Sequence, residues 1–121
     1  VDADADPQTL SVALYDHLTI NPYFWADIAT EAVALAFAGL LHGRGEFAKS
    51  MLFAVNLGRD SDTNAAIAGC IAGAMSGIAS FPKEWVDGLV PVAGDCIRTM
   101  AGIHPLDVAD QLITLLEESH A

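Results

Sequence analysis

An uncharged segment, residues 64–79, constrains the fold more than any other part of this sequence. It is rich in alanine, and its three glycines, Gly69, Gly73 and Gly77, fall four residues apart, so that they share one face of a helix. Each glycine costs a helix about 1 kcal/mol relative to alanine. Three on one face therefore predict that another helix approaches closely there. Because a membrane span needs about 20 apolar residues, we predict a fully buried core helix instead.

The rest of the sequence also favours helices. No segment shows the sustained alternation of apolar and polar residues that is typical of strands. Pro7 suits the first turn of a helix, Asn21-Pro22 is expected to end that helix, and Gly58 is a typical helix stop. We therefore predict an all-α fold with short connections. The expected helices cover approximately residues 7–20, 23–41, 46–57, 62–79, 83–89, 91–101 and 106–118.

The composition indicates a folded, acidic chain. Of its 121 residues, 53% are hydrophobic and 17% are charged, which excludes a disordered chain. This apolar share is high for a small isolated domain and suggests packing against chain not present here. The first residue is Val1 rather than Met, which we interpret as the interior of a longer protein. The formal charge of −11 argues against nucleic-acid binding through a basic patch. We expect no membrane partner, and the acidic balance fits a protein that binds divalent cations.

The cysteines and tryptophans are expected to be structural. Cys70 and Cys96 lie among small or apolar residues, and their spacing indicates neither a disulfide framework nor a zinc site. We predict two buried free thiols and a cytoplasmic location. Trp25 and Trp85 are predicted to pack in the core or between helices.

The residues that point to chemistry are Asp60, Asp62 and Thr63, just before and at the start of the glycine-rich helix. Side chains two residues apart in an extended loop point the same way, so two carboxylates and a hydroxyl can converge on one point. Such hard oxygen ligands suit Mg²⁺, Mn²⁺ or Ca²⁺. A simpler interpretation is a helix N-cap, where Asp and Thr are common and carboxylates interact well with the helix dipole.

A calcium-binding loop is a third interpretation, and the sequence excludes it. Asp60, Asp62 and Asn64 match its first three ligand positions. The loop then requires Gly where Ala65 stands and a bidentate Glu where Ile71 stands.

A longer segment, residues 54–74, resembles the signature near the C-terminus of the ADP-ribosylglycohydrolase family. That signature reads Gly-x-Asp-x-Asp-Thr, followed by Ala-rich residues and Gly-x-x-x-Gly. The likeness continues through Phe81-Pro82-Lys83-Glu84-Trp85, which is similar to a Pro-x-x-Trp segment of the family, and it is good over about residues 35–90.

The resemblance implies a compact, orthogonal all-α domain with two divalent metals, usually Mg²⁺ with Mn²⁺ as an alternative, in a central cleft. It implies that Asp60, Asp62 and Thr63 are metal ligands, with Asp62 as the best candidate to bridge both metals. The activity implied is hydrolysis of the glycosidic bond between ADP-ribose and a modified protein side chain or small acceptor. About six or seven helices of the larger bundle would lie in this chain.

The sequence departs from the family pattern in two places. Many members carry Gly-Gly where this chain has Gly58-Arg59. Gly58 and Arg59 are the candidate substrate-binding residues, and Arg59 would contact a substrate phosphate or neutralise the carboxylates. The Thr-Asp-Asp ligand set of the family's N-terminal half does not occur. We therefore expect residues 1–121 to be the C-terminal portion of a single domain whose N-terminal half is a necessary partner, and the chain alone to be inactive. The alternative is a non-catalytic relative that binds ADP-ribose or is structural, as a crystallin is.

Overall fold

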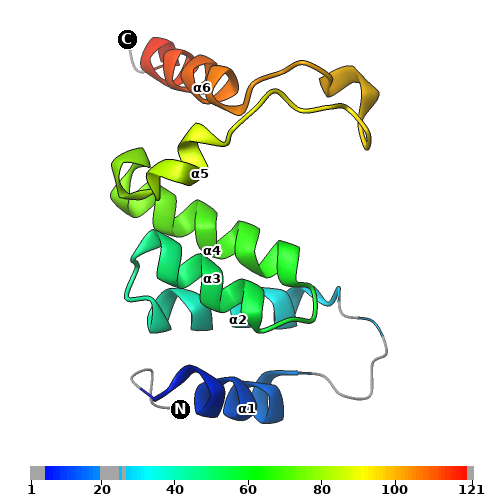
Figure 1. The fold of residues 1–121 in the computed structure, drawn as a ribbon, viewed down its shortest axis with the longest axis vertical. Helices are drawn as coiled ribbons and strands as arrows, with labels where there is room; N and C mark the ends of the chain where they lie inside the picture. Colours follow the sequence, from blue (N-terminus) through cyan, green and yellow to red (C-terminus); the bar gives the residue numbers. More distant parts are fainter. Residues whose placement is uncertain (1–4, 20–24, 26, 120–121) are drawn as a thin grey trace. The chain divides into compact units, whose positions relative to one another are not determined.

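The computed structural model describes residues 5–19, 25 and 27–119, and over these residues the chain forms helices and no strand. The all-α prediction is confirmed. Six α-helices lie in this part of the chain, in the order shown in Figure 1, with two short 3-10 helices at Ile78–Ser80 (η1) and Arg98–Met100 (η2). The α-helices are α1 (Pro7–Leu18), α2 (Ala29–His42), α3 (Phe47–Asn56), α4 (Ser61–Ser76), α5 (Lys83–Asp87) and α6 (Pro105–Ser119).

The chain divides into two units, residues 1–81 and 82–121. In the first unit, α2, α3 and α4 pack against one another and α1 packs on α2. Its central cluster draws on α1, α2 and α3 and consists of buried Leu10, Leu14, Leu35, Phe53 and Leu57. Burial of these side chains is the main source of stability for helices of this length, which are marginal alone in water.

The helices α2 and α3 approach each other closely at Gly39. A Cβ placed on Gly39 would lie 2.8 Å from the carbonyl oxygen of Ser50 and 2.9 Å from the Cβ of Ala54. No side chain fits in that space, so glycine allows the two backbones to approach. This contact is the one that the sequence led us to expect on α4.

The prediction for the glycine face of α4 is wrong in its detail. Gly69 faces the side chain of Met51, and Gly73 faces the ring of Phe81, rather than the backbone of another helix. Gly77 ends α4 with a φ of 70°, a left-handed conformation that favours glycine. The predicted helix to residue 79 is therefore three residues too long. Nor is α4 fully buried, because one face buries Asn64, Ala65, Ala68 and Ala72 while Cys70 is exposed.

Other helix boundaries also differ from the predictions. The first helix ends at Leu18, and the end predicted at Ile20 lies outside the described residues. Asp27 and Ile28 are not helical, so the second helix starts at Ala29 rather than at Tyr23, which itself lies outside the described residues. The third and last helices match their predictions closely.

No α-helix forms over residues 91–101. This segment contains only the short 3-10 helix η2 and folds back on itself, since the amide of Val92 donates to the carbonyl of Ile103 and the amide of Gly102 donates to the carbonyl of Val92. Gly94 allows this return, because its φ is 84° and a Cβ on it would lie 2.6 Å from the Cβ of Ala101. The prediction of a helix did not take Gly94 and Gly102 into account as turn signals.

Two expectations about buried side chains are also wrong. Cys70 and Cys96 are exposed free cysteines rather than buried thiols. Trp25 is 69% exposed. Among the described residues, no helix has both the length and the apolar character needed to cross a bilayer.

Candidate metal centre at the start of α4

The turn between α3 and α4 carries the residues that the sequence singled out. It consists of Leu57, Gly58, Arg59 and Asp60, and it connects the end of α3 to the start of α4. Gly58 has a φ of 72° and Arg59 a φ of 58°. Glycine tolerates this left-handed region, but a residue with a side chain adopts it at a cost.

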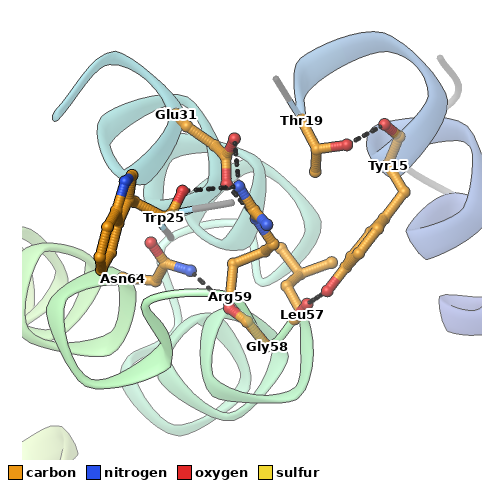
Figure 2. Close-up of polar contacts among 8 residues, drawn as sticks. All are labelled: Tyr15, Thr19, Trp25, Glu31, Leu57, Gly58, Arg59 and Asn64. Carbon is orange, nitrogen blue, oxygen red and sulfur yellow. Dashed lines mark hydrogen bonds and ion pairs between the residues drawn. The ribbon is translucent and has the colours of Figure 1, made fainter. Parts of the chain in front are cut away.

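Side chains from two helices hold the first half of this turn (Figure 2). The hydroxyl of Tyr15, in α1, donates to the carbonyl oxygen of Leu57. The side-chain amide of Asn64, in α4, donates to the carbonyl oxygen of Gly58 at 3.1 Å. Asn64 is fully buried, so water competes little with this hydrogen bond.

Arg59 is held by Glu31 of α2 (Figure 2). Its Nε donates to Oε1 of Glu31 and its Nη2 donates to Oε2 at 3.1 Å, which is the paired geometry that favours arginine over lysine. Nη2 also donates to the carbonyl oxygen of Trp25 at 3.2 Å. The hydrogen bond to Glu31, more than any other cause, raises the pKa of Arg59. The side chain of Glu31 is 1% exposed and that of Arg59 is 20% exposed.

This arrangement bears on the two roles considered for Arg59. The guanidinium neutralises a buried carboxylate of α2, and its described contacts do not include Asp60 or Asp62. Sequence reasoning did not identify Glu31 as a member of this site. Glu31 could have been identified because it is a carboxylate within the apolar run before residue 41, and a buried charge requires a partner.

Asp60 and Asp62 both lie at the start of α4, and not in an extended loop as predicted. Asp60 is the N-cap residue of α4 and Asp62 lies in its first turn. A hydrogen bond with the Asp60 carboxyl is the main cause that lowers the pKa of Asp62, with backbone N–H groups of Asp62 and Thr63 contributing in the same direction. Asp62 is exposed, and Asp60 and Thr63 are half-buried.

The cap interpretation does not account for the carboxylate of Asp60. The side chain of Asp60 makes no capping hydrogen bond to α4. Within the described part of the chain, neither Asp60 nor Asp62 forms an ion pair with Lys or Arg. When both carboxyls are ionised, they repel each other, and a cation between them would relieve that repulsion.

The donor set fits part of a hard-cation site. Two carboxylates and the hydroxyl of Thr63 supply the oxygen ligands that Mg²⁺ and Mn²⁺ prefer. No cluster of three or more His, Cys, Asp or Glu side chains suited to a metal occurs among the described residues. Asp60, Asp62 and Thr63 could therefore hold a metal from one side only.

An apolar groove begins beside Asp62 and runs along α4. Its far end carries the rings of Phe47 and Phe81, which are stacked with their centroids 3.6 Å apart. The groove is lined by Phe47, Met51, Asp62, Ala65, Ala66, Gly69, Cys70, Gly73 and Phe81.

Comparison with known proteins agrees with the motif. The chain is 50% identical over 44 residues to an ADP-ribosylarginine hydrolase, Tri1, of Serratia proteamaculans (strain 568). The matched segment is 36% of this chain and 12% of that relative's length. No solved structure matches the chain. The family model of ADP-ribosylglycohydrolase matches residues 2–120, and the chain belongs to that family.

Proposed function

We propose that this chain is part of an ADP-ribosyl hydrolase, to which it gives the metal ligands Asp60, Asp62 and Thr63. The reaction is hydrolysis of the glycosidic bond between ADP-ribose and a modified protein side chain or small acceptor. The observation that carries the proposal is the placement of Asp60 and Asp62 at the start of α4, where Asp60 makes no capping hydrogen bond and neither carboxylate has a Lys or Arg partner in the described part of the chain. Membership of the family supplies the reaction class.

The two carboxylates have distinct places in the proposed site. Asp62 lies in the first turn of α4, where the helix dipole favours its ionised form, and it is the more exposed of the two. It is therefore the better candidate to bridge two metals, while Asp60 and Thr63 would each bind one. Two Mg²⁺ or Mn²⁺ ions, when bound, supply Lewis acidity that holds ribose hydroxyls and lowers the pKa of a water. The chain's own part is to present three oxygens from one rigid helix start.

The substrate to test first is ADP-ribosylated arginine, because the relative with 50% identity is named for hydrolysing it. Asp60, Asp62 and Thr63 approach a metal from one side, so we propose that the remaining ligands come from an N-terminal half of a larger domain. The two free cysteines are compatible with a cytoplasmic location, which we propose as well.

The test is release of ADP-ribose from ADP-ribosylarginine by the product of the complete gene, with Mg²⁺ and with EDTA. Asp60→Asn and Asp62→Asn are each expected to lower turnover by at least about 100-fold, since an amide is a much weaker ligand for a hard cation. Asp110→Asn, which changes an exposed carboxylate of α6, serves as the control and should keep full turnover. Residues 1–121 alone should release none. Full activity in either ligand variant would overturn the ligand assignment.

A non-catalytic, ADP-ribose-binding or structural role is the second candidate. Its motivation is that the family's Thr-Asp-Asp ligand set does not occur in residues 1–121. Two measurements distinguish an ADP-ribose-binding protein from the hydrolase. It would bind ADP-ribose in a calorimetric titration, and it would release none from ADP-ribosylarginine in the hydrolysis assay.

A further inference from the structure

Three consecutive residues before Asp60 are each tied to a different helix. Tyr15 of α1 binds the carbonyl of Leu57, and Asn64 of α4 binds the carbonyl of Gly58. The side chain of Arg59 reaches back to Glu31 of α2, 28 residues earlier in the chain. The first two ties act on backbone atoms, and only the third acts through the side chain of the residue that adjoins Asp60.

The backbone conformation of Arg59 indicates that its side chain has a structural role. A glycine would adopt a φ of 58° without strain, whereas arginine adopts it at a cost. The surroundings must therefore hold it in place, and the guanidinium provides the means through three hydrogen bonds, two to Glu31 and one to the carbonyl of Trp25. Because Glu31 is buried, water competes with this contact far less than with a surface pair.

We propose that the Glu31–Arg59 ion pair is a positioning device that fixes the turn before α4 and so sets where Asp60 and Asp62 lie at the start of that helix. The pair also directs the positive charge of Arg59 into the helix bundle, which leaves both carboxylates available to a cation. Glu31 and Arg59 act through Asp60 and do not contact the metal or the substrate. The proposal rests on the proposed function only for the identity of the bound cation.

A double variant, Glu31→Gln with Arg59→Gly, separates positioning from stability. Glycine suits the backbone conformation at position 59, and glutamine leaves no buried charge without a partner, so the protein is expected to stay folded. The positioning contact is nevertheless gone. Arg59→Lys is the conservative variant, because it keeps the charge but cannot reproduce the paired geometry. Lys83→Gln with Asp87→Asn removes an exposed ion pair of α5 and serves as the matched control.

Two readouts are measured well below the unfolding temperature of each protein. The first is hydrogen exchange of the Asn64 amide, which donates to the carbonyl of Asp60 at 2.9 Å and so reports on the start of α4. The second is Mn²⁺ affinity, measured by electron paramagnetic resonance on the product of the complete gene. The double variant should exchange the Asn64 amide at least about 10-fold faster and bind Mn²⁺ about 10- to 100-fold more weakly, the usual range for residues that orient metal ligands. Arg59→Lys should fall between it and the native protein.

The outcomes decide the proposal in each case. Native exchange at Asn64 in the double variant would overturn it, as would native Mn²⁺ affinity combined with a lowered unfolding temperature, which describes a merely structural pair. If the native protein binds no Mn²⁺, the proposed metal site fails, and hydrogen exchange alone still decides whether the pair positions the turn. If the double variant does not fold, the exchange rate of Arg59→Lys decides: faster exchange supports positioning and native exchange overturns it.

Discussion

At the scale of single residues, the start of α1 shows how one carboxylate couples the fold to pH. Asp6 is the N-cap of α1, and its Oδ1 accepts hydrogen bonds from the amides of Gln8 at 3.1 Å and Thr9 at 3.0 Å. Hydrogen bonding from Thr9, through its side chain and then its backbone, lowers the pKa of Asp6 from 3.8. A pKa that folding lowers stabilises the native state above the unfolded pKa, and that contribution is lost as pH falls through the folded pKa.

Asp6→Asn is therefore expected to flatten the acid limb of the stability curve. Asparagine keeps an oxygen that accepts from the first-turn amides but does not titrate. The unfolding temperature of the native protein should drop more steeply below pH 4 than that of Asp6→Asn. Asp6→Ala, which lacks any cap oxygen, should unfold at a lower temperature than both at neutral pH. Parallel acid limbs in the native protein and Asp6→Asn would contradict this account, and circular dichroism at a series of pH values measures it.

At the same scale, the candidate site was only half predictable. Asp60, Asp62 and Thr63 stand together in the sequence, so a short motif contains them. Glu31 and Tyr15 lie 28 and 42 residues from the atoms that they bind, and no local pattern encodes such contacts. The sequence therefore indicated the candidate metal ligands but not Glu31 and Tyr15, which fix the turn that carries them.

At the scale of helices, each of the six α-helices in the described part of the chain overlaps a predicted one, and the bounds of α3 and α6 agree to within one residue. Gly77 ends α4, as glycine commonly does, although the predicted helix ran through it to residue 79. The failure at residues 91–101 has a physical cause, because backbone hydrogen bonds between the two arms of the segment replace those of a helix. Composition alone does not distinguish these two ways of satisfying the same amides.

The contact between α2 and α3 makes a quantitative prediction at this scale. Gly39→Ala gains about 1 kcal/mol in helix propensity but places a Cβ against the Ser50 carbonyl, which is backbone and cannot move aside. Overpacking of this kind costs about 1–3 kcal/mol, so Gly39→Ala should lower the free energy of unfolding. Urea denaturation measures the change.

Gly69→Ala is the matched control for that substitution. Its added Cβ would meet the Sδ of Met51 at 3.1 Å, the far end of a flexible side chain that can shift. It should leave the stability unchanged or raise it by up to about 1 kcal/mol. If Gly39→Ala proved as stable as Gly69→Ala, the two helices would not be in the close contact described.

At the scale of the molecule, the core and the candidate site are continuous within residues 5–81. Leu57 is 1% exposed and belongs to the central cluster with Leu35, and it is also the first residue of the turn that leads to Asp60. A substitution that loosens this cluster therefore reaches the site through the backbone, without any contact with the carboxylates.

Leu35→Ala tests the cluster as a unit. Leu35 is fully buried, so truncation to alanine should cost about 2–5 kcal/mol, which combines lost burial with the cavity left behind. Leu41→Ala, in the same helix but 67% exposed, should change stability by less than about 0.5 kcal/mol. Chemical denaturation of both variants measures the difference, and equal costs at the two positions would show that the core lies elsewhere.

The groove along α4 has a practical consequence for measurement. Cys70 is exposed and lines that groove, and it follows Asp62 by about 12 Å along the helix axis at 1.5 Å per residue. A nitroxide attached to this thiol, with Cys96 replaced by alanine, would allow a distance measurement. Its relaxation by Mn²⁺ would report how far the ion sits from Cys70, independently of any substrate or turnover.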